Sequence, residues 1–186
     1  MESPLYFDDI QLGRTWVSPR RTVTEADVIQ FATSTGDFNP LHVDYDFASN
    51  SHYRQPIAHG LLGLSWVAGL GSHAPNVNTL AFTAVRNWEF SRPIFFGDTV
   101  YVETVCLEKT AAGRRAGKIL WQRKLLNQAA QVVQQGTFET LVAIESIVPR
   151  PHSEQQTDRA NSTNGQRLNT APDSDSIQSE SSNKSP

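Results

Sequence analysis

Residues 60–71 form the most apolar stretch of the chain, and their pattern lacks a polar face. The segment reads Gly-Leu-Leu-Gly-Leu-Ser-Trp-Val-Ala-Gly-Leu-Gly, with Ser65 as its single polar side chain. A helix that is apolar on nearly all sides is typical of a buried position rather than of the surface. The pattern therefore predicts a buried helix over 60–71, which is too short to span a bilayer.

A second helix is predicted over residues 25–35, where apolar residues recur at helical spacing. Thr24 followed by Asp27 is typical of a helix start, because a hydroxyl caps the first turn and an acid lies within it. Gly36 favours a helix stop directly afterwards. A short helical piece is predicted after Asp44.

After residue 78 the pattern changes to that of β-strands, rich in Val, Thr, Phe, Trp and Ile and alternating most clearly over 100–105. Turns are marked by Gly97-Asp98, by Ala112-Gly113 and by the neighbourhood of Asn127. Consecutive strands with short links imply an antiparallel meander. The predicted strands are 79–89, 99–109, 118–127 and 131–145.

One buried helix and one long antiparallel sheet predict an α+β fold, with the sheet wrapped around a central helix. The 186 residues are enough for one domain with a substantial core, which we place at 1–148. Residues 149–186 contain no Phe, Tyr or Trp and are dominated by small polar residues. Such a segment buries too little apolar area to offset its ordering entropy, so we predict a disordered polar tail.

Charge and cysteine content narrow the function classes. The net charge of −3 argues against a broad nucleic-acid surface, so we expect no nucleic-acid partner. Cys106 is the only cysteine, which excludes an intrachain disulfide and a cysteine-based metal cage. The first residues show neither a basic region nor an apolar run typical of a signal peptide. We therefore expect a cytoplasmic protein without a membrane partner.

Residues 37–42, Asp-Phe-Asn-Pro-Leu-His, carry the most informative chemistry. On a helix a five-residue spacing would turn Asp37 and His42 about 140° apart, and on a strand it would place them on opposite faces. They converge only in a loop, which Pro40 favours because it fixes its own φ and restricts Asn39. A carboxylate and an imidazole on a stiff bend suit general acid/base work on one small molecule, such as water.

Residues 37–44, together with 56–60, 90–94 and 97–98, resemble the MaoC-like family, which includes the (R)-specific enoyl-CoA hydratases. The likeness covers about residues 5–146. The resemblance implies a hot-dog fold, usually paired as a homodimer. It also implies hydration of a trans-2-enoyl-CoA, or of the matching acyl-carrier thioester, to the (R)-3-hydroxyacyl thioester, or the reverse dehydration. Asp37 and His42 would hold the reacting water, and no cofactor is expected.

Three further residues are candidates for the oxyanion or substrate site. The N–H of Gly60, at a helix N-terminus, suits a thioester oxygen that gains enolate charge, although Gly60 could equally serve a tight helix start. Ser65 could bond a helix carbonyl, orient His42 or line the substrate pocket, and the resemblance favours a site role. Asn39 more simply bonds its own loop.

Other polar residues are weaker candidates. His42, Asp44 and His59 do not match the spacing of a compact zinc site, so we expect no metal. His59 is predicted to be a buried, hydrogen-bonded residue at the helix start. Arg54 and Arg92 suit the phosphates of coenzyme A, with solvated arginines as the simpler interpretation.

Two alternative functions remain open. A hot-dog acyl-CoA thioesterase would also need a polarised water, but it would release free coenzyme A, whereas hydration leaves the thioester intact. A non-catalytic acyl-CoA-binding protein is the other alternative, because a fold does not fix a function.

Overall fold

The computed structural model describes residues 3–145, and these lie in a compact unit of residues 1–150. The tail predicted for 149–186 lies outside the described residues, so its boundary and its disorder stay predictions. Within residues 3–145, no helix has the length and apolar character needed to cross a membrane.

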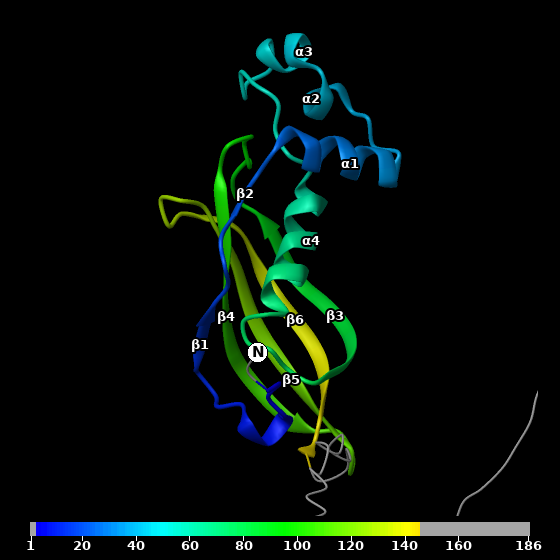
Figure 1. The fold of residues 1–186 in the computed structure, drawn as a ribbon, viewed down its shortest axis with the longest axis vertical. Helices are drawn as coiled ribbons and strands as arrows, with labels where there is room; N and C mark the ends of the chain where they lie inside the picture. Colours follow the sequence, from blue (N-terminus) through cyan, green and yellow to red (C-terminus); the bar gives the residue numbers. More distant parts are fainter. Residues whose placement is uncertain (1–2, 146–186) are drawn as a thin grey trace, which may run out of the picture. The chain divides into compact units, whose positions relative to one another are not determined.

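The described residues form an α+β fold in which helix α4 lies along a long antiparallel sheet (Figure 1). In chain order the elements are η1 (Phe7–Asp9), β1 (Thr15–Val17), β2 (Arg21–Thr22), α1 (Glu25–Thr35), α2 (Pro40–Val43), α3 (Tyr45–Ser49), α4 (Gly60–Gly71), β3 (Thr79–Phe90), β4 (Thr99–Ala111), β5 (Ala116–Leu126) and β6 (Val132–Ala143).

The sheet has the strand order β1-β4-β5-β6-β3, and β2 also pairs with β4. The meander prediction is confirmed for β4, β5 and β6 and is wrong for β3, which pairs with β6 at the opposite edge. The link over residues 91–98 is no tight hairpin. Two backbone hydrogen bonds of 2.8 Å fix this link to other segments. Ala58 N–H donates to the Ile94 carbonyl, and Gly97 N–H donates to the Val23 carbonyl. The link therefore carries the chain across the sheet.

Strands β1 and β2 are absent from the sequence-based prediction, whereas the four long strands match it to within two residues at each end. β1 has three residues and β2 has two. A segment so short shows no reliable alternation, and only its pairing with β4 makes it a strand.

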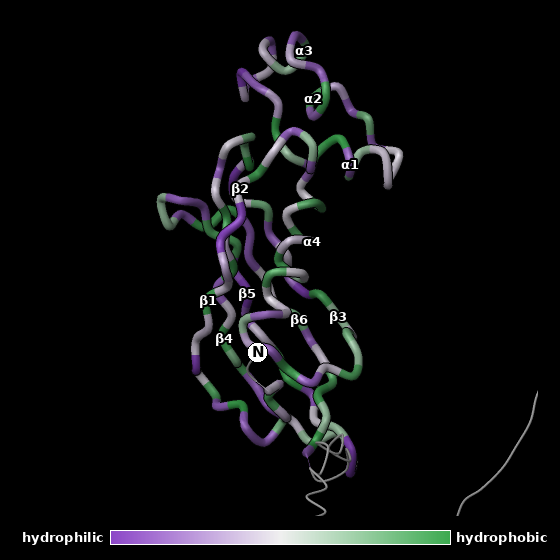
Figure 2. Tube along the Cα trace, viewed as in Figure 1, coloured by the Kyte–Doolittle hydropathy of each residue, from purple (hydrophilic) through white to green (hydrophobic). Residues whose placement is uncertain are grey.

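The predicted helix over 60–71 is confirmed as α4, with the same bounds. Figure 2 shows it in white to green, without strongly hydrophilic residues. The prediction that this helix is buried holds for only part of it in the single chain. Val67 is fully buried, but Leu61 is 60% exposed and Ser65 is also exposed. One sheet covers only one side of a helix, so the other side of α4 stays open.

The helix α1 also matches its predicted bounds. Asp27 N–H donates to Thr24 Oγ1, and Thr24 N–H donates to an Asp27 carboxylate oxygen, which completes a capping box. Gly36 ends the helix in the left-handed region, at φ 79°. The short helix expected after Asp44 is α3, whose first N–H groups bond the Asp44 carboxylate.

Candidate active site

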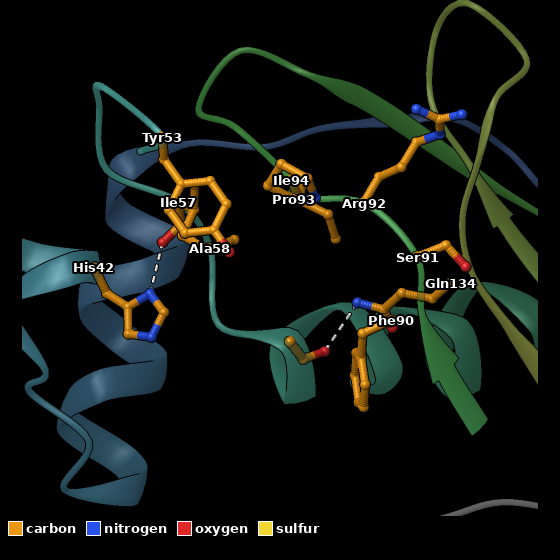
Figure 3. Close-up of a pocket in the computed structure, with 11 residues that line it drawn as sticks. His42, Tyr53, Ile57, Ala58, Phe90, Ser91, Arg92, Pro93, Ile94 and Gln134 are labelled. Carbon is orange, nitrogen blue, oxygen red and sulfur yellow. Dashed lines mark hydrogen bonds between the residues drawn. The ribbon is translucent and has the colours of Figure 1, made fainter. Parts of the chain in front are cut away.

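A cavity of about 210 Å³ lies at the N-terminal end of α4 (Figure 3). Its walls come from α2, from the segment that leads into α4, from the segment after β3 and from β6. The residues that line it are His42, Tyr53, Ile57, Ala58, Gly60, Phe90, Ser91, Arg92, Pro93, Ile94 and Gln134.

His42 reaches this cavity from a single helical turn. The loop predicted for residues 37–42 holds for Asp37 but is wrong for His42, which lies on α2. Asn39 caps that turn by accepting a bond from Leu41 N–H at 3.0 Å. Pro40 is well suited to the first helical position, because its φ is preset and it has no N–H to satisfy.

Asp37 and His42 nevertheless converge, together with His59. One carboxylate oxygen and one nitrogen of each ring all lie within 4.8 Å of one another. This spacing suits one water between Asp37 and His42, since two hydrogen bonds of about 2.8 Å at a water oxygen span a similar distance. The Asp37 side chain is 53% exposed, and it is not among the residues that line the cavity.

The protonation state of His42 follows from its bonds and burial. Its Nδ1 lies 2.8 Å from the Ile57 carbonyl oxygen (Figure 3). A carbonyl only accepts, so Nδ1 carries the hydrogen and Nε2 carries a free lone pair. Burial lowers the pKa of His42 below its usual 6.5, although the Ile57 bond and the Asp37 charge act in the opposite direction. His42 is therefore a neutral imidazole at neutral pH, in the form that accepts a proton.

His59 belongs to this site more closely than the sequence suggested. It is 2% exposed, and its Nε2 donates to the Asp37 carbonyl oxygen at 2.9 Å, as expected for a buried, hydrogen-bonded residue. Its ring also lies against that of His42, with centroids 3.8 Å apart and planes tilted by 32°. His59 thus ties the Asp37 loop to the start of α4 and supports the His42 ring. Its place beside Gly60 in the 56–60 motif is the sequence signal for this role.

The same three residues suit a water better than a metal ion. Imidazole lone pairs lie in the ring plane, and a zinc–nitrogen bond is about 2 Å long. His59 Nε2 and His42 Nδ1 are already bonded to the Asp37 and Ile57 carbonyl oxygens, so these two nitrogens are not free to bind an ion. The absence of a metal site stays a prediction.

Gly60 lines the cavity as the first residue of α4, whereas Ser65 and Asn39 do not line it. The N–H of a first helical residue has no partner inside the helix, and His59 makes no side-chain cap bond there. The Ser65 hydroxyl donates to the Leu61 carbonyl at 2.9 Å, and Asn39 caps α2. In the single chain, both side chains therefore serve local structure.

The two arginines considered for the phosphates of coenzyme A differ in their position. Arg92 lines the cavity, whereas Arg54 does not and lies in a bend with φ 64°. Tyr53, Phe90 and Gln134 were not anticipated. Phe90 is the first residue of the 90–94 segment and Tyr53 lies three residues before the 56–60 segment, so these positions are the available signal. Gln134 has no such signal.

A family model described as "MaoC like domain" matches residues 10–121. Protein MaoC of Klebsiella aerogenes is 36% identical over 111 residues, which are 60% of this chain and 33% of that protein. A 3-hydroxybutyryl-CoA dehydratase of Methylorubrum extorquens is 33% identical over 113 residues, 60% of this chain and 70% of that protein. The chain thus spans about a third of the length of the first relative.

Solved structures agree on the fold. A monoamine oxidase regulatory protein from Archaeoglobus fulgius superposes with a TM-score of 0.70 at 32% identity, over 75% of this chain and 95% of that one. A double-hotdog protein from Mycobacterium tuberculosis superposes with a TM-score of 0.71 at 19% identity, over 80% of this chain and 47% of that one. The predicted hot-dog fold is confirmed.

Proposed function

Because the chain belongs to the MaoC-like domain family, we propose that it is a hydro-lyase acting on enoyl thioesters. The proposed reaction adds water to a trans-2-enoyl-CoA, or to a carrier-bound enoyl thioester, and forms the (R)-3-hydroxyacyl thioester, or runs in reverse. The observation that carries the proposal is the approach of Asp37 to a neutral His42 beside a cavity. Several relatives are named hydratases or dehydratases, which supports the reaction class.

In the proposed mechanism Asp37 and His42 hold one water between them. The unprotonated Nε2 of His42 accepts a proton from this water while its oxygen forms a bond to C3 of the substrate. The electron pair of the C2=C3 double bond moves onto the thioester oxygen. A proton from the same pair of residues then adds to C2, so that water is added across the double bond. Such general acid/base assistance contributes about 10²–10⁴-fold to the rate.

Gly60 is the proposed donor to the thioester oxygen. Its N–H lies at the positive end of the α4 dipole, and Gly60 is one of the residues that line the cavity with His42, which supports the proposal. Negative charge appears on the thioester oxygen only as the enolate forms, so a donor fixed in advance stabilises the transition state more than the substrate.

We also expect a homodimer. β3 is an edge strand of twelve residues with large exposed apolar side chains, and exposed edges favour pairing. Leu80, Phe82 and Phe90 are 55%, 54% and 52% exposed, and Leu61 lies exposed on the open side of α4. A second copy would cover these groups. Sedimentation velocity at micromolar concentration tests this, and a monomer alone would contradict it.

The decisive experiment mixes the purified protein with crotonyl-CoA and follows enoyl absorbance and free thiol together. Loss of absorbance without thiol release is the expected result. Thiol release at the same rate would indicate a thioesterase. Tight binding without either change would indicate an acyl-CoA-binding protein.

A further inference from the structure

Gln134 is a buried amide that connects the sheet to the start of α4. It lies on β6 and is 1% exposed. Its Nε2 donates to the Gly60 carbonyl at 3.0 Å (Figure 3), and its Oε1 accepts a bond from the Trp88 indole N–H at 3.2 Å. A carbonyl only accepts and an indole only donates, so these two partners fix the orientation of the amide. The side chain is thus held at both ends.

The helix makes room for this amide at Gly63. A Cβ atom at position 63 would lie 2.2 Å from Gln134 Nε2 and 2.9 Å from Ile94 Cδ1. Glycine is unfavourable inside a helix, and α4 nevertheless carries it one turn after Gly60. Its absence of a side chain is what allows the amide to reach the Gly60 carbonyl.

The way in which α4 is held at its start differs from ordinary helix capping. An N-cap side chain usually bonds the first free N–H groups of the helix, but His59 makes no such bond. Gln134 instead holds the first residue through its carbonyl oxygen. This anchor fixes the helix start and uses none of the N–H groups that a ligand in the cavity would need.

We propose that Gln134 is a positioning residue, which holds the first turn of α4 through the Gly60 carbonyl so that the Gly60 N–H stays free and aimed into the cavity. This inference rests on the proposed hydro-lyase function for its catalytic consequence. Trp88 orients the amide, and Gly63 gives it space. Gln134 also lines the cavity, but both ends of its amide are already bonded, so its proposed action is through Gly60.

Two substitutions separate this role from simple packing. Gln134→Met fills similar volume without a donor, and Gln134→Glu presents a carboxyl group that can donate only when it is protonated. Gln134→Met at any pH, and Gln134→Glu at a pH where the Glu is ionised, should lower kcat on crotonyl-CoA about 10–100-fold with little change in KM, the loss typical of removing a bond that orients a metal ligand. At acid pH the buried Glu is protonated, because burial raises its pKa, and its O–H donates again. The kcat ratio to wild type should therefore recover for Gln134→Glu and not for Gln134→Met.

A glycine substitution on α4 tests the same contact from the other side. Gly63→Ala should lower kcat by displacing the amide. In a Gln134→Ala background only the end of the flexible Ile94 side chain lies near the added methyl, so the further loss should be small. Three results would each overturn the proposal. The kcat losses of Gly63→Ala and Gln134→Ala could add in the double variant, Gln134→Met could keep the wild-type kcat, or the kcat ratio of Gln134→Glu to wild type could be equal at every pH.

Amide hydrogen exchange tests the anchor without any substrate. In Gln134→Met and in Gly63→Ala, exchange at the first turn of α4 should accelerate relative to the last turn of the same helix. Unchanged exchange would overturn the proposal even if the enzyme is active. Should the wild-type protein hydrate no enoyl thioester, the proposed function fails, while exchange still decides whether Gln134 holds the helix start.

Discussion

The two ends of α4 are held by the sheet in opposite ways. At the N-terminal end Gln134 bonds the carbonyl of Gly60, a residue that lines the cavity, and the His59 side chain does not cap the first turn. At the C-terminal end the buried guanidinium of Arg123 donates to the Val67 and Gly71 carbonyls at 3.3 and 3.2 Å. At the N-terminal end the Gly60 N–H has no partner inside the helix, and at the C-terminal end a buried cation bonds two carbonyls.

We infer that the N-terminal end of α4 serves binding and that its C-terminal end serves stability. A cation is favourable at the negative end of a helix dipole, and Arg123 bonds the Gly71 carbonyl, which has no partner inside the helix, together with the Val67 carbonyl. Burial lowers the pKa of Arg123 to about 10, so it stays charged at neutral pH. Gly71 admits it, since a Cβ atom there would lie 2.7 Å from Arg123 Nη1. Both ends of α4 thus use a glycine to admit a long polar side chain from the sheet.

The largest effect on catalysis is expected from substitutions of Asp37 and His42, near the N-terminal end of α4. Asp37→Asn removes the carboxylate charge, and His42→Ala removes the imidazole. Each should lower kcat/KM on an enoyl thioester by about 10²–10⁴-fold while the circular dichroism spectrum is unchanged. The double variant should be little worse than the worse single variant, because both groups act on one water.

Asp44→Asn is the matched control, since Asp44 caps α3 through two N–H groups and lies outside the cavity. It should cost about 1 kcal/mol of stability at most, with kcat/KM retained. Near-normal hydration by both Asp37→Asn and His42→Ala would disprove the mechanism.

The next largest effect on kcat is expected from removing the Gly60 N–H. Gly60→Pro removes the N–H, while proline is favourable at a first helical position and His59 already has an extended conformation, with ψ 137°. The helix should form, and kcat should fall about 10²–10³-fold.

Gly60→Ala is the control for this prediction. It retains the N–H and adds the same Cβ atom, 3.0 Å from Phe90 Cδ1. Equal losses in the Ala and Pro variants would mean that steric contact, rather than the donor, sets the rate.

A smaller effect should appear in the pH profile. The pKa of His42 is lowered from 6.5, so kcat/KM should be flat near neutral pH and fall in acid with a midpoint below 6.5. The free energy of unfolding should depend on pH in the same direction as kcat/KM. Between the lowered pKa and 6.5 the unfolded chain binds more protons than the native one, so stability decreases as the pH falls through this window. His42→Gln should lose this part of the pH dependence, and a kinetic midpoint above 6.5 would contradict the assignment.

The smallest effect on catalysis is expected at the C-terminal end of α4. Arg123→Met leaves the Val67 and Gly71 carbonyls without their donor, which should lower the free energy of unfolding by about 1–3 kcal/mol. Urea unfolding measures this, and kcat/KM of the folded protein should be unchanged. Arg86→Met, at a side chain that is 59% exposed, should change stability little. If Arg123→Met reduced kcat as much as Gly60→Pro does, the two ends would not differ in role.

Local patterns predicted the parts of the fold that depend on neighbours in the sequence. The bounds of α1 and α4 followed from apolar spacing, from the Thr24 capping box and from Gly36. The same kind of reasoning failed for α2, because Asn39 and Pro40 together start a turn that the loop interpretation did not consider. It also missed that the open side of α4 exposes Leu61, since one sheet cannot cover both sides.

The sequence by itself determined the helix α4, the long strands and the motif that brings Asp37 toward His42, since these depend on residues a few positions apart. Only the tertiary structure decided that β3 lies beside β6, that Gln134 reaches Gly60 across 74 positions and that Arg123 reaches Val67 across 56. Such bonds depend on which strand lies beneath which turn of the helix. A strand that alternates apolar and polar residues shows which side chains point inward, and it leaves open what they meet there.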